Sequence, residues 1–183
     1  GDIILTYKVL TGNNAGVYER YLVSQKASSY DLDRSDELEY WEKNVAPYAD
    51  QMGGQVRWLH EEWASIGESG PPKYLQKTII RFKPGMASHV GRRLARTGET
   101  WEKRDPNAWR RVFSIASGGD LNLFVVFAGF DTFENVLEND STFEEDYNEL
   151  FGWEQNSIDQ ENFFKSLREW NSIIRETLER VDF

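Results

Sequence analysis

Apolar and polar residues alternate near the start of the chain in the way that predicts a β-hairpin. Strand-like runs at Ile3–Leu10 and Val17–Ser24 flank the turn residues Gly12-Asn13-Asn14. Gly and Asn tolerate the positive φ angles that tight hairpin turns need. A helix is predicted to begin at Ser35, and apolar residues at helical spacing within Gln55–Glu68 predict a second helix.

The apolar pattern of the remaining chain predicts the order β-α-β-β-α-α. A Gly- and Pro-rich linker ends at Pro72, so we place an internal boundary there, with one part at 1–70 and a second at 71–183. The predicted elements of the second part are a strand at Tyr74–Lys83, a helix at Met86–Lys103, a hairpin of Trp109–Ala116 with Leu121–Phe130, a helical region at 132–153 that breaks near 139–142, and a long helix at Gln160–Val181.

Two pairs of segments resemble each other at a separation of about 105 residues, which predicts a duplicated unit. Val9–Asn14 is matched by Ile115–Asp120, and Leu59–Ile66 is matched by Leu167–Ile173. The strand and helix predicted at 74–103 have no counterpart in the first part. If the duplication was complete, about 30 to 35 residues should precede Gly1, so we expect that the natural protein is longer at its N-terminus or has lost that portion.

Two stretches carry a resemblance to a known superfamily. Thr78–Gly85 is a strand that ends in Lys-Pro-Gly before a helix, and Ser117–Glu134 is a hairpin strand that ends in Phe-Asp-Thr-Phe-Glu. In these features the chain resembles the dimeric α/β-barrel superfamily, which includes antibiotic-biosynthesis monooxygenase-like proteins, haem-degrading monooxygenases, chlorite dismutases and NIPSNAP proteins.

The resemblance implies an α+β fold of two ferredoxin-like β-α-β-β-α halves, packed sheet to sheet as a barrel-like core. The first half, residues 1–70, lacks its initial strand and helix, and the second half, residues 71–183, is complete. In this superfamily the barrel interior often forms a pocket for a small, frequently aromatic molecule or for haem. The resemblance gives no catalytic motif that can be transferred to this sequence.

Composition excludes several kinds of function. The net charge of −10 argues against general nucleic-acid binding, which depends on neutralising phosphates. The longest apolar run, Leu121–Phe130, is too short for a membrane span. The chain has no Cys and only two His, so a metal site is poorly supported. The compartment stays open: a soluble protein, either cytoplasmic or exported after leader removal, fits the composition.

Candidate chemistry lies first on the predicted helix at Met86–Lys103, where His89, Arg92, Arg93 and Arg96 share an arc. In the functional interpretation this arc faces an anion. His89 is then an acid, a base or a haem ligand, and the arginines pair with carboxylates or propionates. In the alternative interpretation the arc is a solvated helix face, or its arginines pair with the acidic helices of the second part.

The second candidate lies in the first hairpin, at Glu19, Arg20 and Tyr21. Neighbouring residues of a strand point to opposite faces, so one of the two charges is expected to face the barrel interior, where it needs a partner. It would then bind or protonate a ligand together with a tyrosine. Alternatively, this is an edge strand whose charges discourage aggregation. Trp58 faces away from the apolar arc of its predicted helix and is a candidate contact to a ligand, the other half or another subunit.

Three functions follow from these observations. The leading one is a small-molecule-binding α/β barrel for a small hydrophobic or aromatic ligand, without a predicted cofactor. The second is a monooxygenase-like oxidoreductase, either cofactor-independent or haem-dependent, that uses His89 with the nearby arginines. The third is a non-enzymatic interaction module. A monomer of two fused halves and a homodimer are both compatible with the sequence.

Overall fold

The computed structural model contains one antiparallel sheet of seven strands in the order β2-β1-β7-β4-β6-β5-β3. It describes residues 3–23, 33–50, 54–68, 70–134, 142–169 and 171–181. The strands are β1 (Ile3–Val9), β2 (Tyr18–Val23), β3 (Arg57–His60), β4 (Tyr74–Arg81), β5 (Arg110–Ser117), β6 (Leu123–Phe130) and β7 (Ile173–Arg180).

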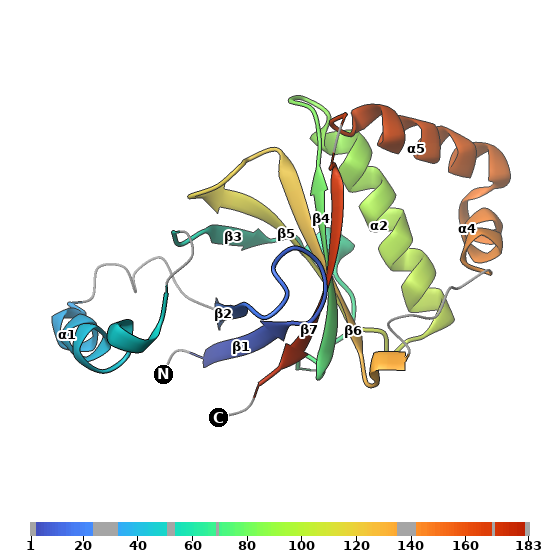
Figure 1. Cartoon of the computed structure of the whole chain (residues 1–183). Helices are drawn as coiled ribbons and strands as arrows, with labels where there is room; N and C mark the ends of the chain where they lie inside the picture. Colours follow the sequence, from blue (N-terminus) through green and yellow to red (C-terminus); the bar gives the residue numbers. More distant parts are fainter. Residues whose placement is uncertain are drawn as a thin grey trace.

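Three helices cover one face of this sheet (Figure 1), and the 3₁₀ turn at Glu62–Ala64 packs against one of them on the same side. Under the helices, an apolar layer joins helix α2 to strands β4, β5 and β6, with Val90 and Leu94 packed near Phe124 and Val126. The helical elements are α1 (Ser35–Asn44), α2 (Ala87–Arg104), α4 (Phe143–Phe151), α5 (Trp153–Ser166) and the short 3₁₀ turns at Ala46–Tyr48 and Glu62–Ala64.

Strand β6 lies in the middle of the sheet because its side chains are apolar on both faces. The run Leu123–Phe127 is buried throughout, with Phe124 and Val126 under the helices and Val125 and Phe127 on the opposite face. A strand buried on both sides is expected to be continuously apolar. We call the face opposite to α2, α4 and α5 the inner face of the sheet.

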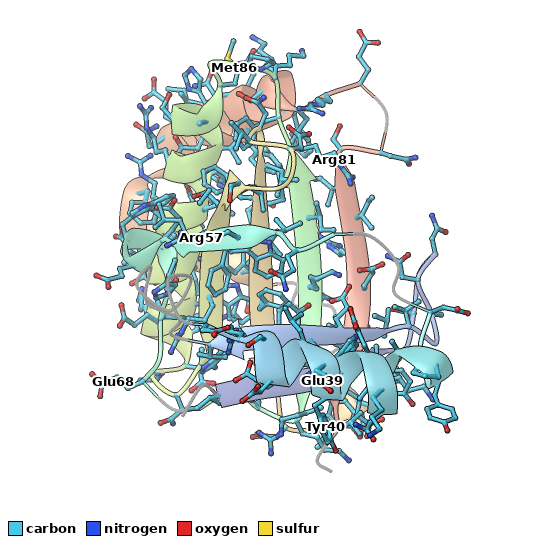
Figure 2. All side chains as sticks on the ribbon, turned by 90° about the vertical axis from the view of Figure 1, so that its left-hand side faces the viewer. Glu39, Tyr40, Arg57, Glu68, Arg81 and Met86 are labelled. Atoms are coloured by element: carbon cyan, nitrogen blue, oxygen red, sulfur yellow. The ribbon has the colours of Figure 1, made fainter. Side chains whose placement is uncertain are left out.

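The sheet curls toward its inner face until its two edges meet. In a flat sheet, six strand spacings would separate β2 from β3 by about 29 Å. The rings of Tyr21 on β2 and Trp58 on β3 are instead 5.4 Å apart, measured between centroids. Figure 2 looks onto this side and shows β1, β2 and β3 crossing in front of the longer strands. The result is a half-barrel that wraps around its own inner face.

The predicted hairpin at the start of the chain and the elements between residues 74 and 130 are confirmed, but two predicted helices are wrong. Gln55–Glu68 holds strand β3 and a 3₁₀ turn, and the predicted helix at Gln160–Val181 ends at Ser166, after which the chain forms strand β7. β7 pairs with β1 on one side and with β4 on the other. These two partners stabilise an extended conformation although the local apolar spacing also fits a helix.

The expected arrangement of two sheets packed face to face is also wrong, because a single sheet runs through both parts of the chain. The structure does not confirm the duplication. Tyr21 on β2 and Val126 on β6, which the repeat would make equivalent, face opposite sides of the sheet. The α+β class is confirmed, and the boundary near residue 70 stays a prediction. Within the described residues, no helix is long and apolar enough to cross a membrane.

Candidate functional site

Aromatic side chains from five strands meet on the inner face where the edges of the sheet approach each other. The ring of Tyr21 lies 6.0 Å from that of Tyr7 and 5.6 Å from that of Phe127, in edge-to-face geometry. The ring of Trp58 lies 5.5 Å from Phe113 and 5.7 Å from Phe127. Such ring pairs stabilise a fold beyond the area they bury. We call these five residues the aromatic cluster.

Three charged side chains lie beside the aromatic cluster and form what we call the charged cluster: Glu19, Lys77 and Glu176. The ammonium of Lys77 is 2.5 Å from Glu19 Oε1 and 2.5 Å from Glu176 Oε2. The side chains of Lys77 and Glu176 are only 6% and 1% exposed, whereas that of Glu19 is 22% exposed. Lys77 and Glu176 therefore form the buried part of the cluster, and Glu19 forms the rim that reaches solvent.

The turn between β1 and β2 packs onto the buried end of the charged cluster. The Asn14 side-chain amide donates a hydrogen bond to Glu176 Oε1, with 2.7 Å between the heavy atoms. Gly12 has a φ of 88°, and a Cβ there would lie 3.1 Å from Glu176 Cγ. Glycine suits this position because it takes positive φ without strain and lets the turn approach. Glu176 Oε1 thus accepts a hydrogen bond, and Oε2 forms an ion pair with Lys77 but accepts no hydrogen bond among the described residues.

Tyr21 joins the two clusters. Its ring belongs to the aromatic cluster, and its hydroxyl donates a hydrogen bond to Glu19 Oε2. Burial, followed by the negative charge of Glu19, raises the pKa of Tyr21 well above its ordinary value of 10.0. The phenol therefore stays protonated near neutral pH and can donate hydrogen bonds. Side by side, the site offers aromatic walls, a phenol, a carboxylate and a buried ammonium.

The structure separates the two charges that the sequence analysis considered together. Glu19 faces the inner side of the sheet, where Lys77 pairs with it, and Arg20 points to the opposite side, with its guanidinium 5.0 Å from the ring centre of Trp41. β2 is also an edge strand, as the alternative interpretation proposed. Trp58 lies on a strand rather than on a helix and contacts the opposite edge of the sheet through Tyr21.

The arc of His89 and the arginines lies on α2, in the helical layer and away from the inner face. Arg93 donates a hydrogen bond of 2.6 Å to Asn156 Oδ1, and Arg96 pairs with Asp159. Arg92 is exposed. Two of the arginines thus pair with groups on the acidic second-part helices, as the alternative interpretation stated. Because they are already engaged there, this set of residues does not fit the binding of haem propionates.

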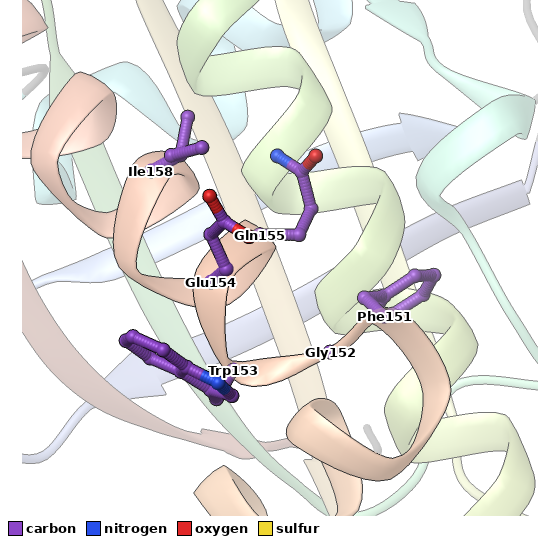
Figure 3. A pocket seen from close by; sticks show the side chains of 6 residues that line it. All are labelled: Phe151, Gly152, Trp153, Glu154, Gln155 and Ile158. Atoms are coloured by element: carbon purple, nitrogen blue, oxygen red, sulfur yellow. The ribbon is translucent and has the colours of Figure 1, made fainter.

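A shallow depression of about 480 Å³ lies elsewhere, at the junction of α4 and α5. Figure 3 shows the six residues that line it, and Trp153 among them is 74% exposed. None of the candidate residues from the sequence lines this depression. It combines one exposed ring with few anchoring polar groups, so the inner face offers the richer chemistry.

Sequence reasoning missed Lys77, Glu176 and Asn14. Lys77 carries a signal that could have been found, because it lies between Leu75 and Ile79 on the same face of a strand that is otherwise apolar there. Glu176 was hidden by the incorrect helix, since only a strand alternation places it on one face with Ile174 and Leu178. Nothing in the local sequence of Asn14 points to a partner 162 residues away.

Comparisons with known proteins agree at the level of the fold. No protein-family model and no curated protein matches the chain in sequence. A solved structure described as an anthrone oxidase-like protein superposes on it with a TM-score of 0.51 and 13% identity, covering 100% of this chain and 78% of that chain. At this identity the similarity shows the fold alone. The fold of the whole chain thus resembles that of this neighbour, and the resemblance to the dimeric α/β-barrel superfamily stays a prediction.

Proposed function

We propose that this protein binds a small planar aromatic molecule on the inner face of its half-barrel, against Tyr21 and Trp58. The observation that carries the proposal is the position of Tyr21, whose ring contacts the opposite edge of the sheet while its hydroxyl is bonded to Glu19. Small-molecule sites combine apolar and aromatic walls with a few polar groups that orient the ligand. Both components occur together here.

The charged cluster supports the same proposal. Burying an ion pair contributes little to stability, and apolar residues of similar volume commonly serve as well or better. Lys77 and Glu176 nevertheless lie almost completely buried in a face that is otherwise apolar. Charged groups beside aromatic side chains can orient a ligand, and this role in recognition would account for the buried cluster.

Anthrone is a suitable first probe, because it is planar and aromatic and because the structural neighbour is described as anthrone oxidase-like. Titration should be followed by amide NMR, which locates the ligand as well as detecting it. We expect shifts concentrated on β2, β3 and β5. Trp58→Leu should weaken binding about tenfold, as the loss of a ring contact implies.

The matched control is Trp153→Leu, which removes an exposed tryptophan from the α4–α5 depression. It should leave the affinity for anthrone unchanged. Shifts centred on residues 151–158, or an equal loss of affinity in both variants, would overturn the proposed location.

The pairing of Glu19 with Tyr21 favours a second candidate function, cofactor-independent oxidation of the bound molecule. A carboxylate can accept a proton from an activated carbon, and the phenol that donates its hydrogen bond to this carboxylate orients it. With anthrone, the ring CH₂ carbon would lose both hydrogens and gain one oxygen atom from dioxygen. The second oxygen atom would leave as water, which gives anthraquinone and balances atoms and electrons.

This second candidate is tested by measuring dioxygen consumption and anthraquinone formation together, in equal amounts. Glu19→Gln should abolish the enzyme-dependent rate. Glu149→Gln, in an exposed pair with Lys103 on the helical layer, should retain it. Anthrone binding without turnover would reject oxidation and leave the binding function intact.

A further inference from the structure

We infer that the inner-face site prefers a planar aromatic molecule carrying a protonated amine over neutral or anionic analogues. The inference rests on the proposed function, because it names the chemical class that the same site takes. It depends on three features: the net charge of the charged cluster, the free acceptor positions of Glu19, and the aromatic faces around them.

The charged cluster carries more negative than positive charge. Two carboxylates, Glu19 and Glu176, share the single ammonium of Lys77, which gives the cluster a net charge of −1. The electrostatic effects on Tyr21 have the same sign, because Glu19 and Glu176 both raise the pKa of its phenol. A positive group that enters beside Tyr21 is therefore attracted, and a negative group is repelled.

Strand alternation places two further cationic residues on the inner face, but their side chains bind elsewhere. Arg180 on β7 donates to the carbonyl of Pro71, and Arg111 on β5 donates to the carbonyls of Ile66 and Gly67. The Arg111 guanidinium also stacks 4.8 Å from the ring centre of Trp109. Both therefore bind the chain segment that precedes β4.

Glu19 can accept a further hydrogen bond from a ligand. Its Oε1 accepts from Lys77 and its Oε2 from Tyr21. An ionised carboxylate has about four acceptor positions. Two positions therefore remain, and the side chain is partly exposed, so a ligand ammonium can reach it. Glu176 is too deeply buried to serve in this way.

The aromatic cluster favours the same ligand charge. The face of an aromatic ring carries partial negative charge and attracts cations, most strongly for tryptophan. Tyr21 lies next to Glu19, and its ring contacts the rings of Trp58 and Phe127. An aromatic ammonium can stack its ring in this cluster and direct its charge to the carboxylate.

The test uses three probes with the same ring: naphthylmethylammonium, naphthylmethanol and naphthoate. Calorimetric titration of the full chain should give the tightest binding for the ammonium and the weakest for the carboxylate. The affinity for the ammonium should also fall as salt is added, since screening weakens partly exposed charge pairs. The affinity for naphthylmethanol should not depend on salt.

Glu19→Gln removes one negative charge and keeps one of the two acceptor oxygens, with a donating NH₂ group in place of the other. It should weaken binding of naphthylmethylammonium about tenfold and change the affinity for naphthylmethanol less than about twofold. Glu149→Gln, on the helical layer, is the matched control and should change neither. If Glu19→Gln fails to fold, the three probes and the salt series on the unaltered chain still decide the question.

The outcomes separate the inference from the proposed function. Naphthoate binding as tightly as naphthylmethylammonium would overturn the preference for a cation and leave aromatic binding in place. An ammonium affinity that does not respond to salt would do the same. If none of the three probes nor anthrone binds, the proposed function fails and this inference fails with it.

Discussion

Besides the single buried Arg110, the described part of this protein holds two clusters of largely buried charged side chains, which differ in charge balance and in access to solvent. In the helical layer, Asp159 pairs with Arg96 and accepts a 2.8 Å hydrogen bond from Tyr147. Arg93 lies 4.0 Å from the centre of the Tyr147 ring and bonds Asn156. These five residues connect α2 to α4 and α5, and their single carboxylate is matched by two guanidinium groups.

On the inner face the proportion is reversed, because one ammonium serves two carboxylates. The five residues around Asp159 lie between three packed helices, whereas the charged cluster reaches solvent through Glu19. The comparison teaches that buried charge by itself does not identify a functional site. A network whose charges are fully engaged between helices stabilises packing, and one with surplus charge at an accessible rim can bind a ligand.

The largest effect is expected from Lys77→Met, which removes the ammonium between two carboxylates. Two buried negative charges would then face each other without compensation, and we expect the free energy of unfolding to fall by about 4 kcal/mol. Denaturant unfolding followed by circular dichroism measures this change. Lys103→Met, on an exposed pair in the helical layer, is the control. A loss no greater than in that control would show that the ion pairs of Lys77 with Glu19 and Glu176 contribute little to stability.

A smaller loss, about 2 kcal/mol, is expected from Asp159→Asn. The amide keeps the shape of the side chain but leaves Arg96 without its ionic partner, and Arg96 is 25% exposed, so water compensates in part. The same unfolding experiment applies, with Asp146→Asn as the control in a more exposed pair. If binding of anthrone also weakened, the separation of the two clusters would be wrong.

Tyr21→Phe should cost about 1 kcal/mol at neutral pH through the lost hydrogen bond to Glu19. The substitution should also change how the stability of the protein falls at high pH. The folded state holds the phenolic proton more tightly than the unfolded state, because the pKa of Tyr21 is raised on folding.

The contribution of the protonated Tyr21 phenol to stability is complete below the pKa of about 10 that tyrosine has in the unfolded chain. It is lost as pH rises through the pKa of Tyr21 in the folded protein. Thermal melts in alkaline buffers should therefore fall less steeply with pH in Tyr21→Phe than in the unaltered protein. Tyr18→Phe, on the same strand at an exposed position, should retain the original slope. Identical slopes in all three proteins would show that Tyr21 does not contribute.

The smallest effect is expected from Arg92→Ala. Arg92 belongs to the arc that the sequence analysis singled out, but its side chain is exposed. Its removal should leave the unfolding midpoint unchanged, because surface substitutions away from such networks are nearly neutral. A shift comparable to that of Arg96→Ala would mean that all three arginines act as one unit.

Sequence alone predicted the first hairpin and the elements from β4 to β6, because each has a clear local signal. The apolar run of β6, the glycines of the turns and the amphipathic spacing of α2 are properties of neighbouring residues. The alternation rule also required that Glu19 and Arg20 face opposite sides of their strand, and the structure places them so.

Only the tertiary structure decided the identity of β3 and β7, because their apolar spacing fits a helix as well as a strand. Pairing with β5, and with β1 and β4, resolved that ambiguity in favour of strands. The same pairing assembled the candidate site, since it brought Glu19, Lys77 and Glu176 together from distant parts of the chain. Local sequence encodes which face a side chain takes. The partners it meets there depend on long-range strand pairing and on the curl of the sheet, which no short window of sequence contains.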